Sequence, residues 1–121
     1  MTLPVVLAIG VLGGLGSIAR LLVGGAVMRR VGGAFPCGTL AVNLSGSLLL
    51  GVLAGAALGS DAYRLAATGL LGAYTTFSAW MLASHRLALD GRPRLAAANV
   101  AGSLVLGVAA VWLGRRIGLA L

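Results

Sequence analysis

Four long apolar stretches alternate with short segments that carry most of the charged residues. The stretches cover about residues 3–27, 37–58, 65–84 and 95–114. Each is long enough to approach or exceed the ~20 residues that an α-helix needs to cross a hydrocarbon core of about 30 Å. The pattern therefore predicts an all-α membrane protein with four transmembrane helices, in which residues 1–121 form one domain.

The composition agrees with a chain that lives in a bilayer. Hydrophobic residues make up 60% of the chain and charged residues 9%, whereas water-soluble domains carry about 25% charge. We therefore expect a multi-pass protein of the cell (plasma or inner) membrane, with the lipid bilayer as its surroundings.

The net charge of +7 comes from nine arginines against two aspartates, and the chain has no lysine. The arginines lie mostly between the apolar stretches and after the last one, where they fit topology signals and anionic headgroups, so no nucleic-acid partner is expected. The arginines are divided slightly unevenly between the two expected sides of the membrane. One side holds Arg29, Arg30, Arg86, Arg92 and Arg94, and the other holds Arg64, Arg115 and Arg116.

The stretch over 65–84 contains glycines, threonines and aromatic residues in its middle, which is unusual at membrane depth. Gly69 and Gly72 permit the helix to break, and Thr75 and Thr76 can complete backbone hydrogen bonds around that break. Non-helical backbone in a bilayer persists where it is buried in protein or lines a wet cavity. A broken helix also exposes carbonyls that can hold a cation such as Na⁺ and N–H groups that favour an anion.

Several side chains near the expected break could contact an ion. Thr76, Ser78 and Asn43 offer donors, and Phe77 and Trp80 are spaced to project on one side of a helix. Aromatic rings have a positive edge, which can contact a small anion. The aromatic pair could instead be a packing stripe, and Asn43 could form an interhelical hydrogen bond, worth ~0.6 kcal/mol on average, rather than line a pore.

Arg20 lies within the first apolar stretch and is open to two interpretations. A charge in a membrane segment normally faces a partner or water, so Arg20 could be a vestibule charge that attracts anions. It could also be a structural anchor whose long side chain reaches a nearby interface. Gly10 and Gly14 precede it with the GxxxG spacing of closely packed membrane helices.

The chain lacks the residues that other functions of small membrane proteins require. Asp61 and Asp90 lie outside the apolar stretches, and a proton-coupled exporter needs a titrating group inside the membrane. Ser84 and His85 are adjacent and have no third group to orient them, so no enzyme is expected. Cys37 stands alone, and no cluster has the spacing of metal ligands.

Three segments resemble the signature segments of the Fluc (CrcB) fluoride channels. They are Gly13-Gly14-Leu15-Gly16-Ser17-Ile18-Ala19-Arg20, Gly38-Thr39-Leu40-Ala41-Val42-Asn43-Leu44-Ser45-Gly46-Ser47 and Gly72-Ala73-Tyr74-Thr75-Thr76-Phe77-Ser78. They occur in the family's order, and with the four-helix pattern the resemblance covers nearly the whole chain.

The resemblance implies an antiparallel dual-topology dimer with two pores, which conducts fluoride passively out of the cytoplasm. It also implies a structural Na⁺ at the dimer centre, held by the backbone carbonyls of Gly72 and Thr75. Arg20 matches an arginine of the family's first helix. Carried over by position, Asn43 and Phe77 would line the fluoride path, and Ser78 would belong to a polar track beside the aromatic residues. We add Thr76, Trp80 and Ser103 to the expected path.

This chain departs from the family's pattern near the expected path. Trp80 stands where the family has a second phenylalanine, and Ala79 stands where it has a threonine. The last helix has Asn99, Ser103 and Gly107 where the family often has a tyrosine and further hydroxyls. A tryptophan edge can still contact an anion, and its indole N–H is an added donor. Two assemblies therefore remain open: a conducting homodimer, and a heterodimer in which this chain is a non-conducting or partner subunit.

Overall fold

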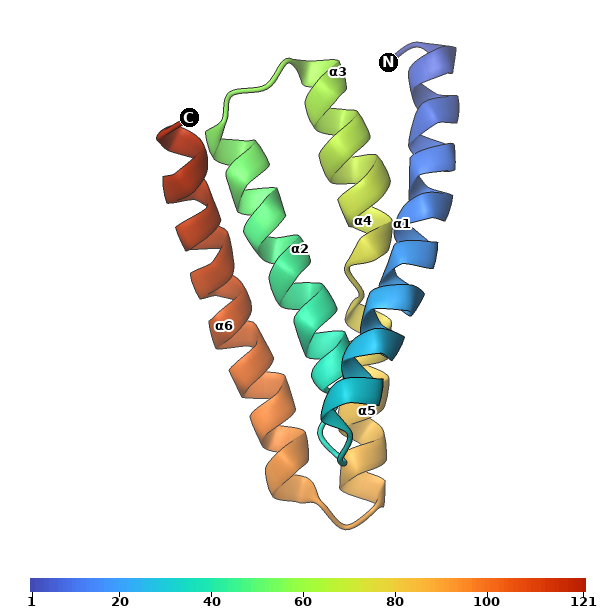
Figure 1. Cartoon of the computed structure of the whole chain (residues 1–121), viewed down its shortest axis with the longest axis vertical. Helices are drawn as coiled ribbons and strands as arrows, with labels where there is room; N and C mark the ends of the chain where they lie inside the picture. The colour runs from blue at the N-terminus through green and yellow to red at the C-terminus, as the bar shows by residue number, and fades with distance from the viewer.

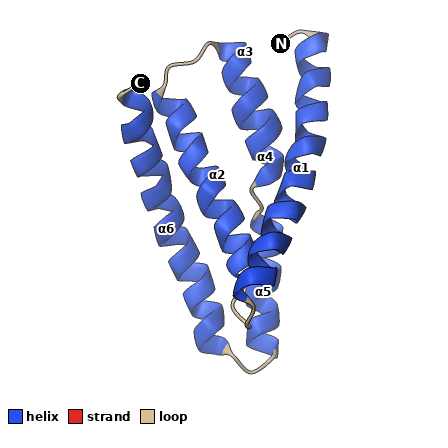
Figure 2. Cartoon of the chain, viewed as in Figure 1, coloured by secondary structure: helices blue, strands red, loops and turns tan.

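Three continuous helices and one bent helix make up the chain (Figure 1). The computed structural model describes residues 1–121, and helices and loops account for all of them (Figure 2). The continuous helices are α1 (Leu3–Val31), α2 (Cys37–Gly55) and α6 (Pro93–Leu119). The bent helix consists of α3 (Ser60–Tyr63), the π-helical turn η1 (Arg64–Leu71), α4 (Gly72–Tyr74) and α5 (Phe77–Leu89).

Several helix ends differ from the predicted ones. Helix α1 continues to Val31 rather than ending near residue 27, so Arg29 and Arg30 occupy its last turn instead of a loop. Positive charge is favourable there because the carbonyl end of a helix is partially negative. Gly32 then ends the helix with φ +66°, a conformation that glycine adopts without strain. Helix α6 likewise extends to Leu119, past the predicted end near residue 114.

The helices run alternately up and down, so the two termini lie at the same end of the molecule (Figure 1). Helices α1, α2 and α6 are each long and apolar enough to cross a membrane. The bent helix covers the same span in pieces, and α5 supplies 13 residues of it. The chain is therefore a multi-pass membrane protein with one interrupted crossing.

Glycines set how closely α2 and α6 approach each other. A Cβ atom on Gly114 or Gly118 of α6 would overlap backbone carbonyls of α2. A Cβ atom on Gly51 or Gly55 of α2 would overlap backbone of α6 in the same way. Such close backbone contact is how membrane helices associate when lipid is as apolar as their side chains.

Helix α1 packs against η1 and α4, which form the first part of the bent helix. Gly16 allows this contact, because a Cβ atom there would overlap the carbonyl of Leu70. Gly10 and Gly14, which have the GxxxG spacing, face open space with no atom within 4 Å of a Cβ position. This GxxxG pair therefore makes no helix contact within the chain.

The chain buries little of itself. Only 15 of its 121 residues are buried, and leucine, valine and isoleucine side chains are exposed along α1 and α6. Exposed apolar faces of this extent are expected where lipid or another membrane protein covers them. Val42 and Asn99 are the largest fully buried side chains, and both lie close to the bend.

Candidate functional site

The third helix is bent, as predicted, and the bend falls on two residues with extended backbone. Thr75 has φ −76° and ψ 155°, and Thr76 has φ −147° and ψ 123°. We call these two residues the break. Gly69 and Gly72, which were expected to permit it, are helical instead. Gly69 lies against α1, where a Cβ atom would be 3.3 Å from the Cα atom of Ile9.

Both threonines complete backbone hydrogen bonds around the break, which is the role predicted for them. The Thr75 hydroxyl donates to the carbonyl of Leu71 at 3.0 Å. The Thr76 hydroxyl accepts from the N–H of Ala79 at 3.1 Å and so caps the start of α5. The break is therefore a defined local structure that its own side chains stabilise.

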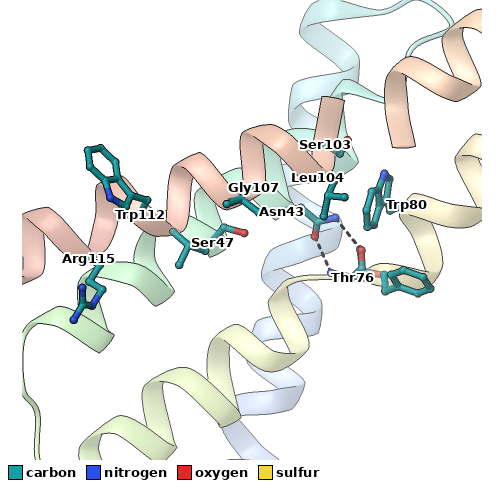
Figure 3. A pocket seen from close by; sticks show the side chains of 12 residues that line it. Asn43, Ser47, Thr76, Trp80, Ser103, Leu104, Gly107, Trp112 and Arg115 are labelled. Carbon is teal, nitrogen blue, oxygen red and sulfur yellow. Dashed lines mark hydrogen bonds between the residues drawn. The ribbon is translucent and has the colours of Figure 1, made fainter. Parts of the chain in front are cut away.

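Asn43 connects α2 to the break through the oxygen and the nitrogen of its side-chain amide (Figure 3). Its Oδ1 accepts from the N–H of Thr76 at 2.8 Å, and its Nδ2 donates to the carbonyl of Thr76 at 2.8 Å. The predicted interhelical hydrogen bond is thus present. Because an amide nitrogen carries two hydrogens, one N–H of Asn43 remains for another acceptor.

The break also leaves peptide groups without partners in the chain. The carbonyl of Thr75 receives no backbone donor. The N–H of Thr76, which would bond to the carbonyl of Gly72 in a continuous helix, is used by Asn43 instead. The N–H groups of Phe77 and Ser78 are the first of α5, where N–H groups have no partner within the helix, and no side chain accepts from them. These are the groups that the end of one helix and the start of another leave free, and here they lie next to each other.

Phe77 and Trp80 form an aromatic pair on one side of α5, as their spacing predicted. Their ring centroids are 5.6 Å apart and the planes meet at 89°, an edge-to-face arrangement. The indole N–H of Trp80 donates to the carbonyl of Asn99 at 2.9 Å, so the expectation that it is a spare donor is wrong. The ring edges remain available, and Phe77 is 69% exposed in the single chain.

Asn99 is the buried connection between α5 and α6. Its Nδ2 donates to the hydroxyl of Ser84 at 2.8 Å, and its Oδ1 accepts from the hydroxyl of Ser103 at 3.2 Å. Ser84 in turn donates to the carbonyl of Trp80 at 2.9 Å. Asn99 is 1% exposed, so its amide holds the two helices together and does not reach an ion path.

A groove of about 600 Å³ runs along α2 and α6 and ends at the break. Five of the six residues expected in the fluoride path line this groove; they are Asn43, Thr76, Phe77, Trp80 and Ser103. The sixth, Ser78, is not in the lining, and its hydroxyl lies 3.3 Å from that of Thr76. The structure thus brings together side chains from three separate apolar stretches.

The groove is also lined by three residues that were not expected in the path: Ser47, Trp112 and Arg115. A helical pattern was present for two of them. Ser47 follows Asn43 by one turn of α2, and Arg115 is the last of a row on α6 in which every fourth residue shares a face. That row comprises Ser103, Gly107, Val111 and Arg115.

Arg20 lines a second, smaller cavity of about 340 Å³ rather than the groove. Thr39, Val42, Thr76 and Ala79 line the same cavity, so Thr76 borders both spaces. Arg20 has no acidic partner, because the one ion pair of the chain joins Arg64 to Asp61 at 3.7 Å. Its charge faces a cavity beside the break.

The fold and the groove define a small multi-pass membrane protein whose third helix is interrupted beside a groove, as helices are at the ion sites of transporters. Comparison with known families gives the particular class. The model of the family described as "CrcB-like protein, Camphor Resistance (CrcB)" matches residues 7–115, and the chain belongs to this family.

Similar proteins match the chain over nearly its full length. The chain is 49% identical over 116 residues to the fluoride-specific ion channel FluC 2 of Mycolicibacterium paratuberculosis, covering 96% of this chain and 95% of that protein. It is 50% identical over 117 residues to FluC 2 of Mycobacterium tuberculosis, covering 97% and 93%. It is 47% identical over 116 residues to FluC 1 of Symbiobacterium thermophilum, covering 91% and 94%.

Proposed function

We propose that this chain is a fluoride-specific ion channel that lets cytoplasmic fluoride leave the cell passively. The observation that carries the proposal is the groove at the break, where Asn43, Thr76, Phe77 and Trp80 meet, in a chain whose relatives are fluoride-specific channels. Hydrogen fluoride enters as a neutral acid and dissociates inside, and the anion then leaves down its gradient.

Fluoride holds its water tightly, so a path must replace that water with many weak contacts. The remaining N–H of Asn43 is one donor, and the free N–H groups of Phe77 and Ser78 are others at the positive end of α5. The edges of Phe77 and Trp80 supply further positive surface. Ser103 contributes its hydroxyl oxygen to the lining, with its hydrogen donated to Asn99.

We further propose that a structural Na⁺ binds to carbonyls at the break. The carbonyl of Thr75 receives no backbone donor, and the helical donor for the carbonyl of Gly72, the N–H of Thr76, is used by Asn43. Hard cations prefer oxygen ligands of this kind. No group of His, Cys, Asp and Glu side chains in the chain could hold a metal ion instead. Bound Na⁺ would neutralise the partial negative charge of these carbonyls and so stabilise the break.

Two carbonyls are too few for a hard cation, which gathers about six oxygen ligands. A second copy related by a twofold axis would raise the set to four carbonyls, closer to that number, and this supports the antiparallel dimer. The exposed Phe77 and the small number of buried residues also fit a chain that is covered by a partner. The five-to-three division of arginines gives only a weak bias in orientation, as dual insertion requires.

The alternative assembly is a heterodimer in which this chain is the partner subunit. Trp80 and Ala79, which differ from the family's pattern, favour it. A proton-coupled exporter is disfavoured because Asp61 and Asp90 are exposed and lie near helix ends. Neither carboxylate reaches the groove or the cavity of Arg20.

The test uses the purified chain alone in liposomes loaded with potassium fluoride and made permeable to potassium. A fluoride electrode follows release without a proton gradient, and parallel liposomes contain chloride. Fast fluoride release without chloride release supports the homodimeric channel. Release that appears only after co-expression with a paralogue supports the heterodimer, and release that needs a proton gradient would contradict the proposal. Replacing sodium by N-methylglucamine on both sides should abolish release if Na⁺ is structural.

A further inference from the structure

The groove connects the break to a single positive charge at its far end. Asn43, Thr76 and Trp80 lie at one end, and Trp112 and Arg115 lie at the other (Figure 3). Along α6, Ser103 and Arg115 are separated by roughly 18 Å, at a rise of 1.5 Å per residue. Arg115 is therefore too distant to contact an ion at the break and lies instead where the groove reaches the helix end.

Nothing in the chain neutralises Arg115. No carboxylate lines the groove, and the one ion pair of the chain involves Arg64 and Asp61. Between Ser103 and Arg115 the same face of α6 carries Gly107 and Val111, which offer no hydroxyl to an anion. Ser47 and Trp112 add neutral donors to the lining, so the guanidinium is the only full charge that attracts an anion into the groove.

The neighbouring arginine has a different position. The guanidinium of Arg116 lies 5.8 Å from the centroid of the Trp112 ring and is not part of the groove lining. Both arginines are exposed and end the same helix. If the two served only as anchors to anionic headgroups, they would be equivalent. Their different positions relative to the groove distinguish them.

We propose that Arg115 is the capture residue of the groove: its charge raises the local concentration of fluoride at one mouth and so speeds entry. The inference rests on the proposed fluoride conduction along the groove. A charge at an aqueous mouth with low-dielectric walls concentrates counter-ions, and the effect falls with ionic strength. Because Arg115 acts on entry and not at the break, it changes the rate at low fluoride and leaves the preference for fluoride over chloride unchanged.

The experiment compares Arg115→Gln with the matched variant Arg116→Gln in planar bilayers. Fluoride currents are recorded at subsaturating fluoride, with ionic strength set by an impermeant organic salt. At about 0.01 M, where the Debye length is ~30 Å, we expect Arg115→Gln to reduce the current about threefold to fivefold. At about 1 M, where the Debye length is ~3 Å, the difference should disappear. Arg116→Gln should reduce the current less than Arg115→Gln at the low ionic strength and match the wild type at the high one, and Arg115→Lys should keep most of the current.

The outcomes separate the inference from the proposed function. If the wild type carries no fluoride current, the proposed function fails and the inference fails with it. If the wild type conducts and Arg115→Gln equals Arg116→Gln at low ionic strength, only the inference is overturned. A loss in Arg115→Gln that is the same at both ionic strengths also overturns it, because a structural role would not be screened by salt. Should Arg115→Gln fail to fold, Arg115→Lys with a current that no longer depends on ionic strength would refute the inference.

Discussion

Asn43 permits a direct test of how the break is held. The substitution Asn43→Ala removes two hydrogen bonds of 2.8 Å and leaves the N–H and the carbonyl of Thr76 without partners. Thr76 is buried, with 9% exposure. The substitution should therefore destabilise the folded chain and, in addition, loosen the geometry of the break.

The size of the effect depends on whether water reaches the break. Each unsatisfied group in a dry interior costs about 1–3 kcal/mol, so a dry break would lose about 2–6 kcal/mol. Interhelical hydrogen bonds in membranes are worth ~0.6 kcal/mol on average, which gives about 1.2 kcal/mol for two. Asn43 borders a groove of about 600 Å³, which has room for water. We therefore expect a loss of about 1–2 kcal/mol.

Reversible unfolding in detergent, followed by tryptophan fluorescence, measures this loss. Ser47→Ala is the matched control, because Ser47 lines the same groove one turn away and its hydroxyl makes no hydrogen bond with the chain. We expect the control to change the free energy of unfolding by less than about 0.5 kcal/mol. If Asn43→Ala is as stable as Ser47→Ala, the amide does not hold the break and the reasoning is wrong.

Fluoride flux gives a second measurement on the same variants. Asn43→Asp keeps an acceptor for the Thr76 N–H but places a carboxylate, which cannot donate when ionised, beside the Thr76 carbonyl and in an anion path. We expect Asn43→Asp to abolish fluoride flux and Ser47→Ala to retain it. Full flux in Asn43→Asp would contradict a fluoride path along this groove.

Three further predictions concern packing and the aromatic pair. Gly114→Ala should destabilise the chain by about 1–3 kcal/mol, because its Cβ atom would overlap the Leu48 carbonyl. Gly102→Ala is the control and should leave stability unchanged, because the space at its Cβ position is open. Thermal unfolding compares the two variants. Phe77→Ile should abolish fluoride release from liposomes while size-exclusion chromatography shows an unchanged assembly, and retained release would place the path elsewhere. Trp80→Phe should keep release but lower stability by about 1 kcal/mol, since the ring remains and the hydrogen bond to α6 is lost; unchanged stability would show that this bond contributes little.

Local composition was sufficient for the membrane helices and for the bend. Long apolar stretches can satisfy their backbone groups in lipid only as helices, and Thr-Thr-Phe-Ser in the third stretch signalled an interruption. Its position was harder to predict, because glycine is compatible with both a helix and a break. Close contact with α1 keeps Gly69 helical, and the hydrogen bonds of Asn43 select Thr76 instead.

Sequence alone determined the all-helical membrane class, the bent third helix and five of the twelve residues that line the groove, because hydrophobic length and residue chemistry are local properties. Only the tertiary structure decided which donors are already used. The Trp80 indole N–H is used by Asn99, and the Asn43 amide is used largely by Thr76. The tertiary structure also decided that Arg115 lines the groove and that Arg116 does not. These outcomes depend on which helix face meets which neighbour, and that follows from glycine contacts between segments far apart in the chain.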